Sequence, residues 1–147
     1  MSQPAPQAAA DPAVIRSYHA HIYFRDAAER ERALLLRTWM AERFLLQLGR
    51  VHDVAVGPHT APMYQVAFAP EVFAAFVAWL MLNHAQLSVL VHPNTGRARD
   101  DHLSHALWLG EPLPVRGEVL TNRLEDDVIS PIEPNTQPLS GPRERQI

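Results

Sequence analysis

The feature of this sequence that most restricts its fold is the alternating segment at residues 15–24. Its letters, IRSYHAHIYF, are typical of a β-strand, in which successive side chains point to opposite faces. One face would carry Tyr18, Ala20, Ile22 and Phe24, and the other would carry His19, His21 and Tyr23. We therefore expect the apolar face to pack against helices and the face with two imidazoles to point away from them.

Two helices and three further strands are expected after this strand. The first helix is expected over residues 26–48, because Asp26 and Glu29 resemble a capping box and Gly49 is a natural helix stop. Pro70 suits the first turn of a second, apolar helix that ends near residue 83. Apolar or alternating runs predict strands at residues 50–56, 63–68 and 87–92, and they allow a short extra strand at residues 107–109.

The resulting order, β-α-β-β-α-β, is that of a ferredoxin-like α+β fold. We expect a four-stranded antiparallel sheet with two helices on one face and the other face open, and with the first strand between the third and the fourth. Residues 1–13 are expected to form a flexible leader and residues 14–112 the folded domain. Residues 113–147 are rich in proline and are expected to form an extended tail.

Composition excludes several classes of protein. The 147 residues suffice for one domain, and the formal net charge of −3 without a long charge run argues against nucleic-acid and membrane-surface binding. All 13 basic residues are arginine, so no lysine can form a Schiff base. The absence of cysteine removes disulfides and thiolate ligands and agrees with a cytoplasmic location. We expect neither a signal peptide nor a transmembrane segment.

The expected topology brings several histidines towards one end of the sheet. The fourth strand runs antiparallel to the first, so His92 would lie beside His19. His102 and His105 follow soon afterwards and could fold back towards this end. The nearest carboxylates are those of Asp100 and Asp101.

One further histidine, His59, is expected in the loop between the second and third strands, within the sequence GPHTAP. The topology places this loop at the opposite end of the sheet. His59 could therefore join the other histidines only if the loop curled over the sheet. His52 and His84 are expected to have no part in a site.

Two imidazoles on one strand with a third on another strand are a common way to hold a divalent transition metal. Without cysteine, such a site must be built from histidine and carboxylate, which suits Fe(II), Mn(II) or Zn(II). Two histidines and a carboxylate leave three positions on iron for substrate and dioxygen. Three histidines with an open position would also serve zinc hydrolysis, and the residues alone do not decide between the two.

Four segments resemble the DOPA 4,5-dioxygenase family over about residues 15–115. They are YHAHIYF at 18–24, GPHTAPMY at 57–64, LSVLVHPNT at 87–95 and HALWLG at 105–110. The resemblance implies a ferredoxin-like fold, a non-haem metal, and extradiol ring opening of a DOPA-like catechol by dioxygen. It carries over onto His19, His21, His59, His92 and His105.

The resemblance also implies roles for these residues. His21, His92 and a third ligand, either His19 or a carboxylate, would hold Fe(II), so the expected metal ligands are His19, His21 and His92. The metal would bind both catechol oxygens and dioxygen. His59 or His105 would act as general base and later as acid, and the ring would open to a muconic semialdehyde.

Two other functions remain open at this point. The first is another histidine-metal enzyme on the same scaffold, such as a zinc hydrolase or an isomerase. The second is a non-enzymatic, dimeric ferredoxin-like binding module whose open sheet face packs against a partner, although His19, His21 and Gln65 make that face polar. A homodimer is expected in every case, because an open sheet face and a long tail both favour association.

Overall fold

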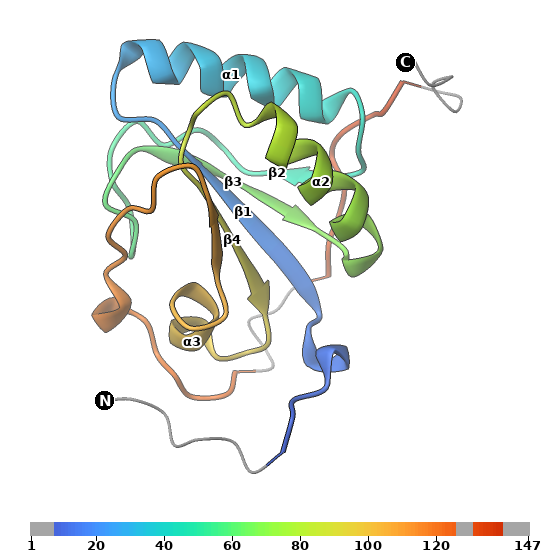
Figure 1. The fold of residues 1–147 in the computed structure, drawn as a ribbon, viewed down its shortest axis with the longest axis vertical. Helices are drawn as coiled ribbons and strands as arrows, with labels where there is room; N and C mark the ends of the chain where they lie inside the picture. Colours follow the sequence, from blue (N-terminus) through green and yellow to red (C-terminus); the bar gives the residue numbers. More distant parts are fainter. Residues whose placement is uncertain (1–7, 126–130, 140–147) are drawn as a thin grey trace.

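The computed structural model describes residues 8–125 and 131–139 (Figure 1). The segments 1–7, 126–130 and 140–147, which belong to the expected leader and tail, lie outside the described residues. The strands are β1 (Ser17–Tyr23), β2 (Gln47–Leu48), β3 (Met63–Phe68), β4 (Val89–Asn94) and β5 (Leu107–Leu109). The helices are α1 (Ala27–Ala41), α2 (Phe73–Asn83) and α3 (Ala98–His102), with 3-10 turns at Pro12–Val14, Pro70–Val72 and Gly117–Val119.

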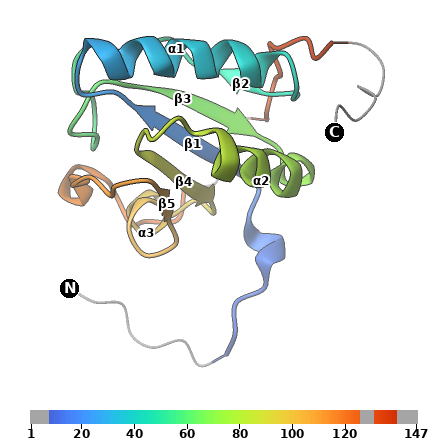
Figure 2. The same cartoon turned by 45° about the horizontal axis from the view of Figure 1, so that its top comes forward.

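The strands form one antiparallel sheet of five strands in the order β2-β3-β1-β4-β5. The chain is therefore α+β, with β1 between β3 and β4 as predicted. The prediction of four strands was wrong, because Leu107–Leu109 pairs with β4 and extends the sheet. Figure 2 shows α1 and α2 on one side of the sheet and α3 on the other.

The face of β1 that carries Ala20 and Ile22 forms the main core, as predicted. Both side chains are fully buried in a cluster with Leu36 of α1 and Phe76 of α2. Burying a side chain the size of Ile22, Leu36 or Phe76 contributes about 1.5 to 3 kcal/mol, so this layer holds the two helices on the sheet. Tyr23 points to the opposite side and belongs to a second, smaller cluster.

The first helix begins as predicted and ends earlier than predicted. The Asp26 carboxylate accepts a hydrogen bond from the Glu29 backbone N–H at 2.8 Å, which caps the helix. The helix ends at Ala41 and not at residue 48, because Phe44 and Leu46 turn inward to pack against the core. The residues that follow form the two-residue edge strand Gln47–Leu48.

The expected strand at residues 50–56 was also wrong. In this segment only His52 pairs with the sheet, through a bridge to Met63. Val51 packs against the helix-side core, whereas Val56 packs against the cluster on the opposite side. The segment thus passes around the edge of the sheet from one face to the other, which a strand within the sheet could not do.

The second face of the sheet is covered, although the sequence predicted an open face. Ala106, Trp108 and Val115 pack against Tyr23 and Leu90 on this side. The expectation failed because the chain after β4 forms α3 on this side of the sheet, adds β5 to the edge and then returns over the same side as far as the 3-10 turn Gly117–Val119 (Figure 2). Side chains on this face are consequently enclosed rather than solvated.

Part of the expected tail pairs with the edge strand. The Asn135 backbone N–H donates to the Leu46 carbonyl at 2.9 Å, and its side-chain amide bonds both the N–H and the carbonyl of Leu48. The Thr136 hydroxyl accepts from the Leu46 N–H at 3.0 Å. These bonds satisfy the outer edge of β2. Across the described ranges, no helix is both long and apolar enough to cross a membrane.

Candidate metal centre

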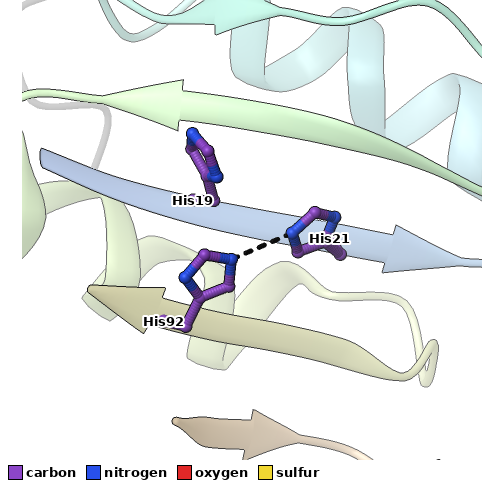
Figure 3. Close-up of side chains that lie close together, drawn as sticks. All are labelled: His19, His21 and His92. Atoms are coloured by element: carbon purple, nitrogen blue, oxygen red, sulfur yellow. Dashed lines mark hydrogen bonds between the residues drawn. The ribbon is translucent and has the colours of Figure 1, made fainter. Parts of the chain in front are cut away.

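Histidines from β1 and β4 meet on the covered face of the sheet. His19 and His92 are directly paired across the two strands, as predicted, and Figure 3 shows His21 beside them. The Nε2 atoms of His21 and His92 lie 3.1 Å apart. Both side chains are buried, with 2% and 1% of their surface exposed. The antiparallel register of the central strands is therefore sufficient to bring these three imidazoles together.

His59 joins these histidines because its loop curls over the sheet. Its ring centroid lies 4.1 Å from that of His21. The loop is fixed to the returning chain, because the Arg116 N–H donates to the Pro58 carbonyl at 2.8 Å and the Thr60 hydroxyl donates to the Pro114 carbonyl at 2.7 Å. The sequence allowed His59 to join the other histidines only if this loop curled over the sheet, and the loop does so.

The last residue of α3, His102, is a fifth member, which was expected near this end of the sheet but not as a metal ligand. Its ring centroid lies 3.9 Å from that of His92 and 5.9 Å from that of His21. The short helix α3 carries it there, and no hydrophobic pattern at residues 98–102 predicts that helix. We name His19, His21, His59, His92 and His102 the histidine cluster.

His105 lies apart from the histidine cluster. Its Nδ1 is 3.3 Å from a carboxylate oxygen of Asp101, and 47% of its side chain is exposed. It belongs to neither of the metal-compatible sets described below. Of the two residues that the sequence suggested for proton transfer, His59 is the one that lines the pocket.

Within the described residues, two sets of three histidines have the spacing of a metal site. In each set the ligand nitrogens lie within 4.8 Å of one another, and the sets are His19, His21 and His92, and His21, His59 and His102. Two nitrogens bound to one metal at about 2.1 Å are separated by about 3.0 to 3.4 Å. The 3.1 Å between the Nε2 atoms of His21 and His92 matches that separation.

Backbone carbonyls fix the protonation of two rings in the cluster. His92 Nδ1 lies 2.9 Å from the Pro93 carbonyl, and His102 Nδ1 lies 2.8 Å from the Ala98 carbonyl. A carbonyl oxygen only accepts, so each Nδ1 carries the proton and each Nε2 keeps a lone pair. Metal-binding histidines in proteins are commonly oriented in this way.

Burial keeps the cluster uncharged near neutral pH. Desolvation, with repulsion from His102, lowers the pKa of His19 and of His59 to about 4. The same two causes, burial first and neighbouring imidazoles second, hold the pKa of His21 and of His92 well below the ordinary value. Burial also lowers the pKa of His102. Neutral imidazole is the form that binds metals.

The cluster fits a metal bound by nitrogen. Either nitrogen of the His21 ring could bind it, because Nε2 faces His92 Nε2 and Nδ1 is buried with no hydrogen-bond partner, a costly state that a metal would relieve only at Nδ1. Neither metal-compatible set contains a carboxylate among the described residues. The nearby Asp101 carboxylate is occupied, because it accepts the Thr95 backbone N–H at 2.8 Å and the Thr95 hydroxyl at 2.7 Å. Imidazole ligands suit iron and zinc alike, so the donors do not fix the metal.

A pocket of about 310 Å³ opens onto the cluster. This volume lies at the small end of the range for small-molecule sites and suits a single-ring compound. The amides of Gln65 and Asn94 supply hydrogen-bonding groups in its wall. The other lining residues besides histidines are Pro58, Gly96, Ala98, Asp101, Leu120 and Glu125.

Comparisons with known proteins find a family model and a solved structure that are similar to this chain. The model of the Dopa 4,5-dioxygenase family matches residues 18–119, which include the whole histidine cluster. A crystal structure of a candidate dioxygenase from Nostoc punctiforme is 48% identical to this chain, with a TM-score of 0.74. That similarity covers 76% of this chain and 96% of the Nostoc chain.

Two fungal proteins are also similar to this chain. A DOPA 4,5-dioxygenase from Amanita muscaria is 34% identical over 69% of this chain and 48% of its own length. An uncharacterized 21.2 kDa protein from Botryotinia fuckeliana is 34% identical over 71% of this chain and 63% of its own length. The chain thus spans less than two thirds of each fungal relative. On the family match, this chain belongs to the Dopa 4,5-dioxygenase family.

Proposed function

We propose that this protein is a non-haem Fe(II)-dependent dioxygenase that opens the ring of a catechol by extradiol cleavage. The observation that carries the proposal is the buried histidine cluster at a pocket of about 310 Å³, in a chain of this family. A site with several neutral imidazoles, and with no arginine among the described residues that line its pocket, is suited to a divalent metal and to an uncharged aromatic ring.

His21 and His92 would hold the metal, with His19 or His102 as the third ligand. His21 belongs to both metal-compatible sets, and His92 Nε2 has its lone pair directed away from the Pro93 carbonyl. When bound, Fe(II) would supply positions for the two catechol oxygens and for dioxygen. The low pKa values of these ligands mean that no proton has to be displaced near neutral pH.

The chain would orient the substrate and handle its protons. The pocket wall confines a flat ring beside the metal site, and Gln65 and Asn94 offer hydrogen bonds to substituents. His59 supplies the acid–base chemistry, since its ring lines the same pocket. In the reaction, the carbon–carbon bond next to the diol breaks and both atoms of dioxygen enter the product. The product is a muconic semialdehyde, so no other oxidant or reductant is needed.

A zinc hydrolase is the second candidate, because both metal-compatible sets consist of histidine alone. Three histidines with an open position are typical of zinc sites that activate water. The binding-module alternative relies on an open sheet face, and that face is covered by the chain after β4. We also propose a homodimer, for which sedimentation would give twice the 16.5 kDa mass of the chain.

Oxygen uptake tests the proposal. The protein is reconstituted with Fe(II) without air and then mixed with oxygenated buffer and a panel of catechols. We expect uptake and a new visible absorbance in wild type, both lost in His21→Ala and His92→Ala. His84→Gln, at the end of α2 and outside the cluster, is the matched control. A protein that retains metal without consuming oxygen would favour the hydrolase, and one that retains no metal would contradict both.

A further inference from the structure

We propose that Tyr23 is a positioning residue that holds His59 as a hydrogen-bond donor into the pocket and keeps it from binding the metal. The Tyr23 hydroxyl lies 2.7 Å from His59 Nδ1, and both side chains are buried. The catalytic consequence of this inference rests on the proposed function. Its structural part, the protonation of His59, is independent of any substrate.

The direction of this hydrogen bond follows from what else the hydroxyl could bond. Tyr23 is 1% exposed and lies among apolar side chains, including Leu90 and Met63, with Trp108 stacked at 5.7 Å. Among the described residues, His59 Nδ1 is the acceptor within reach of its O–H. A buried hydroxyl that donates to nothing costs about 1 to 3 kcal/mol. Tyr23 therefore donates, and Nδ1 accepts.

The direction of this hydrogen bond determines whether the other nitrogen of the His59 ring carries a proton. A neutral imidazole carries one proton, so His59 with an accepting Nδ1 must carry its proton on Nε2. His92 and His102 have the opposite arrangement, because backbone carbonyls hold their protons on Nδ1. Within the cluster, His92 and His102 thus present a lone pair on Nε2, whereas His59 presents an N–H on Nε2.

This difference in protonation decides which histidines can bind the metal. His59 belongs to one metal-compatible set with His21 and His102, so spacing alone would permit it to be a ligand. Binding through Nε2 would require its proton to move to Nδ1, which would leave the Tyr23 hydroxyl without an acceptor. His59 accordingly acts first as a donor to an oxygen of the bound substrate, and the metal is left to the other histidines.

The pair is held rigidly enough for this role. The ring of Tyr23 is fixed on one side by Trp108, which belongs to β5, and His59 is fixed by the bridge between its backbone and Val115. Both supports come from the chain that returns across the face after β4. The same returning chain that encloses the cluster therefore also sets the orientation of the donor.

The first arm of the test measures protonation directly. Nitrogen-15 NMR of histidine-labelled full-length protein, alone and loaded with Zn(II), reports which ring nitrogen carries a proton or a metal. We expect His59 to keep its proton on Nε2 in both samples. Zinc bound at His59 Nε2, or a proton on Nδ1, would overturn the proposal. This arm needs neither a variant nor a substrate.

The second arm removes the hydroxyl. In Tyr23→Phe we expect Zn(II) affinity to be at least about one third of that of wild type, because no ligand is lost and His59 becomes free to bind. With Fe(II) and a catechol that wild type turns over, kcat should fall about tenfold or more with little change in KM, as for loss of an oriented acid. Tyr64→Phe is the control, since it removes a buried hydroxyl bond to the Ala33 carbonyl on the helix side.

The two arms separate this inference from the proposed function. A fall of tenfold or more in Zn(II) affinity in Tyr23→Phe would show that Tyr23 supports a ligand, and would overturn the inference. An equal fall of kcat in Tyr64→Phe would also overturn it, because the effect would then be one of general stability. Absence of catechol turnover in wild type, with His59 protonated on Nε2, would contradict the dioxygenase alone.

Discussion

His19 and His92 face each other across the central strand pair, with ring centroids 5.1 Å apart. Opposed residues in an antiparallel pair place their side chains on the same face, so this pairing fixes the floor of the candidate site. A slip of β4 by one residue against β1 would turn the His92 ring into the helix-side core, away from His19. The position of His19, His21 and His92 is therefore a property of the sheet and not of a surface loop.

Metal binding should stabilise the folded protein. A ligand at one hundred times its dissociation constant contributes about 2.7 kcal/mol, which for a chain of this size raises the melting temperature by roughly 5 to 15 °C. We expect this increase with Zn(II) in wild type and its loss in His21→Ala, measured by thermal unfolding. An equal increase in His21→Ala would place the metal elsewhere.

The stability of the metal-free protein should depend on pH between about 4 and 6.5. Burial lowers the pKa of His19 and of His59 to about 4 in the folded state, against the ordinary histidine value of 6.5. The unfolded chain therefore binds more protons in this interval, so stability is complete above pH 6.5 and falls as the pH falls towards 4. Urea unfolding at several pH values measures the effect.

The matched variant for this pH dependence is His19→Gln. It keeps a polar side chain on the same face and removes one imidazole, so the change in stability with pH should become smaller. A pH dependence that is the same in His19→Gln and wild type would contradict the assignment to this residue.

The turn after β5 should be sensitive to an added methyl group. Gly110 has a φ of 70°, and a Cβ there would lie 2.5 Å from the Leu87 carbonyl oxygen. Gly110→Ala should cost about 3 kcal/mol, from backbone strain and overlap together. Gly57→Ala is the comparison, because Gly57 has a φ of 56° with open space around it and should cost about 1 kcal/mol. Equal costs for the two variants, from chemical unfolding, would be inconsistent with the close approach at Gly110.

Asp101 should affect metal binding without being a ligand. Its carboxylate accepts two hydrogen bonds from Thr95 and so ties α3, which ends at His102, to the end of β4. Asp101→Asn would weaken this support, and we expect Zn(II) affinity to fall about tenfold, as for other groups that orient a ligand. Glu118→Gln, at an exposed turn, is the control for loss of a negative charge. An unchanged Zn(II) affinity in Asp101→Asn would show that the tie between α3 and β4 does not support the metal site.

The sequence predicted the part of the site that depends on local rules. The alternation in residues 17–23 determines which side chains share a face, and an antiparallel partner determines that His92 meets His19. Both follow from the geometry of strands without knowledge of any loop. The cap at Asp26 was predictable for the same reason, because it depends on residues three positions apart.

The remaining features depend on where loops run, and no periodicity encodes that. The alternation at residues 50–56 indicated a strand, but Val51 and Val56 are apolar because they contact opposite faces of the sheet. His102 reaches the cluster through a five-residue helix that is stabilised by contacts with residues 117–122. Such long-range contacts decide the enclosure of the pocket, and they are invisible in the local sequence.

The origin of the oxygen atoms in the product tests the central claim most directly. Wild-type protein loaded with Fe(II) is mixed with a catechol that it consumes under ¹⁸O-labelled dioxygen, and the aldehyde is trapped at once for mass spectrometry. The account predicts two labelled oxygen atoms in a ring-opened product, and no such product in His92→Ala. A product with one labelled atom or none, or turnover unchanged in His92→Ala, would contradict the proposed dioxygenase site.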